Sequence, residues 1–173
     1  MSADFSVVSR GRLSRIALLA LFAFLPLSVS ARSALPDYRV IKVADGDTVT
    51  VLSSSMEQLK CRLYGIDAPE KKQAYGQASK LSLSQLAFGR MAQIEIVGRD
   101  RYGRAICRIE VNGVDVNKEQ IARGMAWMYR RYAKDRAYSD AESAAQARHA
   151  GLWREAQPVP PWDFRRIKPR GPF

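Results

Sequence analysis

The fold is decided by residues 38–64, whose sequence is YRVIKVADGDTVTVLSSSMEQLKCRLY. Apolar and polar residues alternate in three short segments, 38–43, 48–52 and 59–64, as they do in strands with one buried face. The first two segments are separated by Asp45-Gly46-Asp47, a tripeptide that favours turns. The stretch therefore predicts a meander of three strands.

The residues that follow predict a helix and two further strands. Apolar residues recur at helical spacing over 75–88, and Gly89 is typical of a helix end. Alternation returns at 92–97 and at 105–111. Five strands with a helix between the third and the fourth is the order of the oligonucleotide-binding (OB) fold. We therefore expect an α+β fold rich in β-structure, a five-stranded Greek-key barrel.

Beyond the fifth strand the pattern is mostly helical. Asn117 is expected to cap one helix, and Ser139 to cap an alanine-rich helix that ends at Gly151. Together with the helix between the strands, this gives three α-helices. Residues 158–173 combine prolines with basic residues, which predicts an extended, loosely ordered tail.

The first 31 residues have the pattern of a cleaved secretory signal peptide. Three arginines precede an apolar run over 16–27, and small residues lead up to Ala31. A retained membrane anchor is the alternative, but a spanning helix needs about 20 apolar residues and Pro26 interrupts this run. We therefore expect export, to a periplasm or to the medium, with no stable membrane association after cleavage.

Cleavage after Ala31 would leave a single domain with short flanking segments. Residues 32–37 are expected to form a linker, residues 38–157 the barrel domain, and residues 158–173 the basic, proline-rich tail. Nothing in the sequence indicates an assembly larger than a monomer.

The composition is that of a basic globular protein. Among 173 residues, 28 Lys and Arg face 17 Asp and Glu, and the formal net charge of +11 indicates a polyanionic partner. One histidine and two cysteines exclude a histidine-rich or four-cysteine zinc site, and a serine–histidine–aspartate triad would depend on His149. Metal chemistry therefore has to rest on carboxylates.

The two cysteines lie on the apolar faces of two predicted strands. Cys61 alternates with leucines, and Cys107 lies among alanine, isoleucine and valine, so both are expected in the core. An exported protein can form a disulfide there, but two inert buried thiols fit the pattern equally well.

Acidic residues gather in one part of this basic chain. Asp45, Asp47, Asp67 and Glu70 fall within residues 45–70, at predicted turns and strand edges. Carboxylates from two loops could hold a hard cation such as calcium. The alternative is that Asp45-Gly46-Asp47 is a simple turn.

Two arginines lie near these acids in the predicted barrel. Strand alternation places Arg62 on the face opposite Cys61 and Leu63, away from the apolar core, and Arg104 lies at the start of the fifth strand. A guanidinium group can donate a planar pair of hydrogen bonds to a phosphate. Each arginine alone could equally serve solubility or a hairpin.

Taken together, the motifs and their order over residues 38–162 resemble those of the staphylococcal nuclease (thermonuclease) family. The matching motifs are Asp45-Gly46-Asp47-Thr48-Val49, Arg62-Leu63-Tyr64-Gly65-Ile66-Asp67-Ala68-Pro69-Glu70, Tyr75-Gly76, Asp100-Arg101-Tyr102-Gly103-Arg104, Val116-Asn117 and Gly151-Leu152-Trp153. The resemblance implies a five-stranded barrel with three helices, in agreement with the pattern of strands and helices.

The resemblance also implies a metal site and a catalytic site. Calcium would be held by Asp47, Asp67 and the main-chain carbonyl of Ala68, with Asp45 supporting the metal and its waters. Further site residues implied or expected are Arg62 and Arg104 on the scissile phosphate, Glu70 on the attacking water, Tyr102 and Tyr132 on the substrate, and Lys71 and Lys72 as attractors of the polyanion.

The function implied is calcium-dependent hydrolysis of DNA and RNA without sequence specificity, leaving 3′-phosphates. Contacts to phosphate and to a stacked base carry little sequence information, so the activity is expected to be nearly independent of sequence and to prefer frayed or single-stranded regions.

Two other function classes remain as alternatives. One is a non-catalytic nucleic-acid-binding barrel, which would have no need for the carboxylates and the phosphate-type arginines. The other is a cell-envelope protein whose basic tail binds anionic surfaces, which leaves the acidic cluster unexplained.

Overall fold

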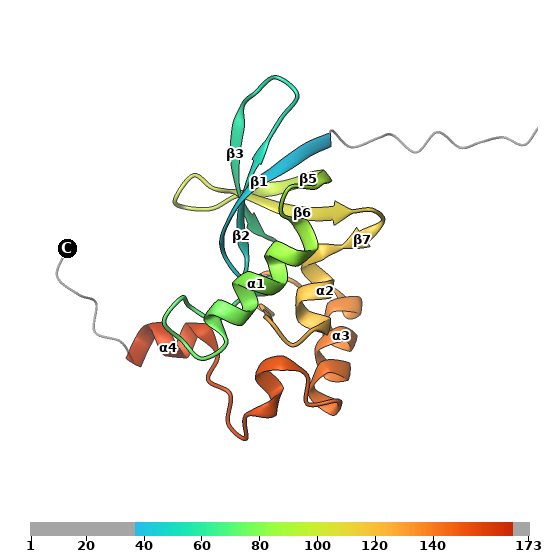
Figure 1. Ribbon diagram of the computed structural model, residues 1–173. Helices are drawn as coiled ribbons and strands as arrows, with labels where there is room; N and C mark the ends of the chain where they lie inside the picture. Colours follow the sequence, from blue (N-terminus) through green and yellow to red (C-terminus); the bar gives the residue numbers. More distant parts are fainter. Residues whose placement is uncertain (1–36, 168–173) are drawn as a thin grey trace, which may run out of the picture. The chain divides into compact units, whose positions relative to one another are not determined.

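The computed structural model describes residues 37–167, which contain the expected barrel (Figure 1). The barrel strands are β1 (Asp37–Asp45), β2 (Thr48–Leu52), β3 (Gln58–Leu63), β5 (Met91–Arg99) and β6 (Ala105–Val111). They are hydrogen-bonded in the order β3-β2-β1-β5-β6, and β3 pairs with β6 in parallel to close the ring. The α+β class and the five-stranded mixed barrel of the OB type are thereby confirmed.

Four α-helices, rather than three, are found among residues 37–167. They are α1 (Gly76–Ala87), α2 (Val116–Ala122), α3 (Arg136–Ala147) and α4 (Pro161–Ile167), with a 3-10 helix η1 (Gly151–Arg154) before α4. The short strands are β4 (Ile66–Asp67), β7 (Val114–Asp115) and β8 (Trp127–Met128).

The α4 helix corrects the prediction of an extended tail. Its first residue is Pro161, and a proline is well accommodated there because the missing N–H would have no partner within the helix. The Phe164 amide already donates to the Pro160 carbonyl at 3.0 Å. Prolines that suggested an extended segment therefore mark the start of a helix.

The predicted helix caps were wrong. Asp115 and Asp135 cap α2 and α3, because each carboxylate accepts a hydrogen bond from a main-chain N–H of the first turn. Asn117 and Ser139 lie inside these helices. The α3 helix also ends earlier than predicted, at Ala147.

Asn117 instead joins α2 to the barrel. Its side chain is fully buried, and its Oδ1 accepts from the Ile109 amide at 3.2 Å. Its Nδ2 donates to the carbonyls of Tyr64 and Cys107, each at 3.0 Å. One amide thus holds the end of β3 and the middle of β6 against the helix.

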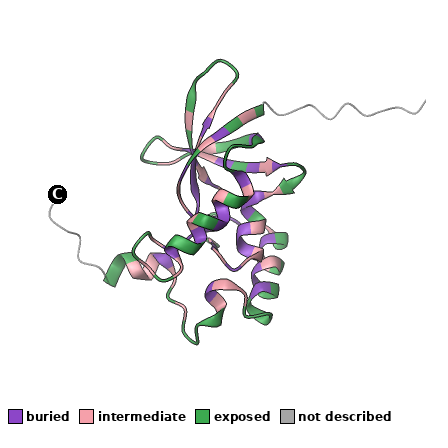
Figure 2. Ribbon diagram, in the orientation of Figure 1, coloured by how far each residue is buried: buried purple, intermediate pink, exposed green. Residues whose placement is uncertain are grey.

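The apolar core lies inside the barrel and beneath the helices that cover it, as the buried residues in Figure 2 show. Cys61 and Cys107 are fully buried there, with a Cα–Cα distance of 5.7 Å, and they form a disulfide. The structure therefore favours the disulfide over two buried thiols.

The predicted signal peptide, and the predicted linker apart from Asp37, lie outside the described residues, as does the end of the tail. Across residues 37–167, the helices are too short or too polar to cross a bilayer.

Candidate active site

Three of the predicted site residues meet where β2, β3 and β4 lie together. Asp47 ends the turn between β1 and β2, and Arg62 lies opposite Thr48 in the β2–β3 register. Arg62 Nη1 is 2.5 Å from Asp47 Oδ2, and Nη2 is 2.8 Å from Asp67 Oδ1. Asp47 and Asp67 are only 6% and 1% exposed. The arginine on the outer face of β3 is therefore a charge partner of two buried carboxylates.

The Asp47 carboxylate is held by two hydrogen bonds. The Ala68 amide donates to Oδ2 at 2.7 Å, and the Thr48 hydroxyl donates to Oδ1 at 3.1 Å. Burial raises the pKa of Asp47 well above its usual range, because the charged form loses its hydration; Arg62 opposes this, and the carboxylates of Asp45 and Asp67 add to it. A nearby cation would therefore stabilise the charged form of Asp47.

The turn that carries Asp47 is supported from both helices that pack on it. A side chain at Gly46 would collide with the Ser79 hydroxyl of α1, so the close approach requires glycine. From α2, the side-chain Nε2 of Gln120 donates to the Gly46 carbonyl at 2.8 Å. Asp45 completes the turn, since its Oδ1 accepts from the Asp47 amide at 3.2 Å.

Glu70 is linked to the buried carboxylate of Asp67 by an arginine of α4. Arg165 Nη1 is 2.7 Å from Glu70 Oε1, and Nη2 is 2.7 Å from Asp67 Oδ2. Sequence reasoning assigned Arg165 only to a general basic tail. A separation of 98 residues from Asp67, after several prolines, left no local signal of this contact.

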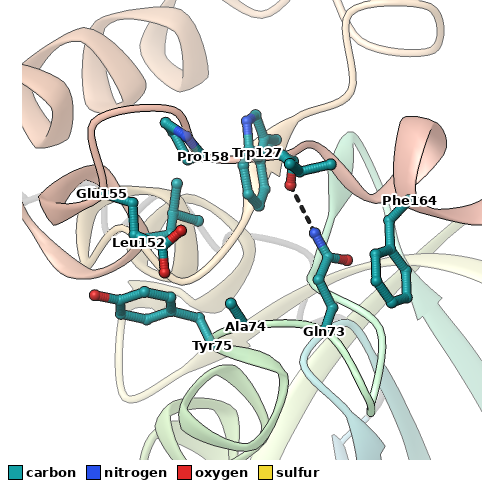
Figure 3. Close-up of a pocket in the computed structure, with 9 residues that line it drawn as sticks. Gln73, Ala74, Tyr75, Trp127, Leu152, Glu155, Pro158 and Phe164 are labelled. Atoms are coloured by element: carbon teal, nitrogen blue, oxygen red, sulfur yellow. Dashed lines mark hydrogen bonds between the residues drawn. The ribbon is translucent and has the colours of Figure 1, made fainter. Parts of the chain in front are cut away.

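The segment before α4 also contacts the loop that carries Glu70. The Glu70 amide donates to Gln73 Oε1 at 3.0 Å, and Gln73 Nε2 donates to the Val159 carbonyl at 2.6 Å. Figure 3 shows this bond at a cavity of about 170 Å³ that is also lined by Trp127 and Phe164. The C-terminal segment and the loop after Glu70 thus line the same cavity.

Arg104 and Tyr102 form a separate group beside this cluster. Within residues 37–167, the ion-pair partner of Arg104 is Asp100, with Nε 2.6 Å from Oδ2, and its guanidinium lies 5.7 Å from the centre of the Tyr102 ring. Arg104 directly precedes β6, and because Ala105 pairs with Cys61, Arg104 lies on the same outer face of the barrel as Arg62. The structure brings Arg104 to the side of the site but not onto its carboxylates.

The remaining predicted substrate residues are exposed around the site. Tyr132 is 60% exposed and packs edge-on against Tyr129, with ring centroids 5.0 Å apart. Lys71 and Lys72 directly follow Glu70 and are exposed. These side chains are accessible to a polyanion.

The donor set fits a hard cation in its chemistry. Among residues 37–167 there is no group of three or more histidine, cysteine, aspartate or glutamate side chains arranged to hold a metal ion. Two side-chain carboxylates, Asp47 and Asp67, are nevertheless both buried and both face positive groups. With a main-chain oxygen such as that of Ala68 and with water, they are the ligand types that calcium prefers.

Comparison with known proteins gives a consistent result. Residues 60–155 match the family model described as "Staphylococcal nuclease homologue". An "Uncharacterized endonuclease" of Haemophilus influenzae is 41% identical over 128 residues, 74% of this chain and 72% of the relative. "Protein ParB" of Escherichia coli is 34% identical over 163 residues, 87% of this chain and 92% of the relative. In Oryza sativa, "Probable staphylococcal-like nuclease CAN1" is 34% identical over 134 residues, 78% of this chain and 39% of the relative.

Proposed function

The chain belongs to the staphylococcal nuclease family, and from this premise we propose that it is a calcium-dependent phosphodiesterase that hydrolyses DNA and RNA without sequence specificity. The observation that carries the proposal is the contact of Arg62 with the buried carboxylates of Asp47 and Asp67. Carboxylates suit a cation and a guanidinium group suits a phosphate, so one site offers both charges needed at a phosphodiester. The names of the Haemophilus and rice relatives support nuclease activity.

Asp47, Asp67 and the carbonyl of Ala68 would hold the calcium ion. When bound, the ion supplies a Lewis acid that neutralises charge on the phosphate. Arg62 and Arg104 donate to phosphate oxygens, whose negative charge grows as water attacks phosphorus. Glu70 accepts the proton of the attacking water and the new P–O bond forms; the bond to the 5′ oxygen breaks, and that oxygen leaves with the electron pair and takes a proton from water, which gives a 3′-phosphate and a 5′-hydroxyl.

Substrate binding would rest on groups that do not distinguish bases. Lys71 and Lys72 would attract the nucleic-acid backbone. Tyr102 lies beside Arg104 and would contact the phosphates, and Tyr132 offers an exposed ring for a base. Single-stranded or frayed regions are therefore preferred, because only there is a base face free to stack.

We also propose that the protein acts after export, as a monomer, in a periplasm or in the medium. The arginine-led apolar run over 16–27 supports export. The Cys61–Cys107 disulfide suits an oxidising compartment.

The proposal is tested by incubating the purified protein with heat-denatured DNA and with RNA, in calcium or in a chelator. Acid-soluble nucleotides are expected to be released in calcium only, and end-group analysis is expected to find 3′-phosphates. Binding of DNA without cleavage under any divalent ion would contradict the proposal and favour the non-catalytic binding module.

A further inference from the structure

The C-terminal helix reaches the candidate active site from outside the part of the chain that matches the family model. That match covers residues 60–155, whereas α4 spans Pro161–Ile167. Arg165 of this helix nevertheless contacts both oxygens of Asp67 and one oxygen of Glu70. The Arg165 guanidinium group thus bonds Asp67 and Glu70, the carboxylates that the proposed mechanism assigns to the metal ion and to the attacking water.

Side-chain packing holds α4 in this place. The Trp162 ring stacks on Tyr129 with centroids 5.6 Å apart and an angle of 11°, and it meets Trp127 edge-on at 6.5 Å. Trp127 pairs with Asp67 between strands β8 and β4, so the same strand pair carries the helix anchor and the carboxylate. Arg165 itself is 43% exposed in its side chain and is not enclosed.

The charges in the cluster make Arg165 a rival of an incoming cation. The three carboxylates of Asp47, Asp67 and Glu70 face two guanidinium groups, those of Arg62 and Arg165. A divalent ion entering the cluster would be repelled by both guanidinium groups and would find both oxygens of Asp67 already hydrogen-bonded to Arg165. With Arg165 withdrawn, an Asp67 oxygen becomes available to the ion and one of the two repulsions is removed.

Resting on the function proposed above, we propose that Arg165 is a further residue of this site: a tethered cation that competes with the divalent ion for Asp67 and with the attacking water for Glu70. The calcium concentration needed for half-maximal activity is then higher than it would be without Arg165. Calcium binding and the release of Arg165 are coupled, and the freed guanidinium group remains next to the substrate.

The test is calcium binding by the full chain, measured by isothermal titration calorimetry without nucleic acid. Arg165→Gln is compared with the wild type and with Arg166→Gln, since Arg166 is in the same helix, 81% exposed in its side chain, and pairs with Asp163. We expect Arg165→Gln to bind calcium on the order of tenfold more tightly. Arg166→Gln is expected to match the wild type, and Arg165→Lys, which keeps the charge, to restore much of the weaker binding.

A second readout separates competition from a role on the substrate. The calcium concentration for half-maximal DNA cleavage is expected to fall in Arg165→Gln by a similar factor, with thermal unfolding confirming an intact fold. Equal or weaker calcium binding by Arg165→Gln would overturn the competition while leaving the calcium enzyme intact, and a lower kcat with unchanged affinity would assign Arg165 to the phosphate. Absence of calcium binding in all variants would overturn both this inference and the calcium assignment.

Discussion

The two arginines that contact Asp67 reach it from parts of the molecule that are held in different ways. Arg62 belongs to β3, which pairs with β2 on one side and with β6 on the other, and its side chain is 17% exposed. Arg165 belongs to a seven-residue helix, and its side chain is 43% exposed.

The difference divides the site into two halves: a fixed half, Arg62 on the barrel strand β3, and an adjustable half, Arg165 on α4. A strand inside a closed barrel cannot shift without breaking the pairing of its neighbours. A short helix held mainly by aromatic packing can leave its place at a much smaller cost in free energy. Arg62 therefore suits a constant role on the phosphate, and Arg165 suits a role that depends on the metal ion.

The largest effect on stability is expected from the disulfide of the barrel, which carries the fixed half of the site. Cys61 and Cys107 are 46 residues apart, and opening a loop of this length costs about 4 kcal/mol in the chain-entropy account. Urea unfolding with and without a reductant measures the loss. The Cys61→Ser/Cys107→Ser double variant is the control, because the reductant should not affect it. An unchanged unfolding free energy on reduction would show that the barrel does not depend on this bond.

The largest effect on activity is expected from Arg62. Arg62→Gln should lower the kcat for DNA hydrolysis by about 100-fold or more, since in the proposed mechanism Arg62 stabilises the transition state. Arg39→Gln is the matched control, because Arg39 is an exposed strand arginine that bonds the Gly89 carbonyl. A variant that kept its fold and more than half of its activity would remove Arg62 from the mechanism.

A smaller loss of stability is expected at the amide that joins the barrel to α2. Asn117→Ala leaves buried main-chain groups of Tyr64, Cys107 and Ile109 without this partner, which should cost about 2 kcal/mol. Gln146→Ala removes an exposed amide and is expected to change little. Equal unfolding free energies for the two variants in urea would contradict the account.

The smallest loss of stability is expected in the adjustable half. Trp162→Ala removes the stack on Tyr129 and should lower the unfolding free energy by about 1 kcal/mol. Calcium binding should become tighter, as in Arg165→Gln, because the helix that holds Arg165 on Asp67 loses its anchor. A stability loss as large as that of Asn117→Ala would make α4 an integral part of the fold.

The division between the barrel and α4 also explains which features of the site could be predicted from the sequence. Alternation over 38–64 correctly gave three strands and placed Arg62 on the outer face, because side-chain direction in a strand follows from the period alone. Pairing of Thr48 with Arg62 then brings the arginine to Asp47. Local patterns were sufficient wherever strand pairing determines position.

The contact of Arg165 could not be predicted in this way. It depends on the packing of Trp162 against Tyr129 and Trp127, between residues far apart in the chain. The choice of Asn117 rather than Asp115 as a cap failed for a related reason. Both residues suit a cap, and only the burial of Asn117 against the barrel decides between them.

The central claim, that Asp67 serves the metal ion that cleavage requires, is tested most directly by DNA hydrolysis as a function of calcium concentration. The wild type is compared with Asp67→Asn and with Asp140→Asn, a variant of an exposed acid on α3. We predict saturable calcium activation in the wild type and in Asp140→Asn, and almost none in Asp67→Asn at the same concentrations. Cleavage by folded Asp67→Asn at the wild-type rate, with the same calcium dependence, would contradict the account.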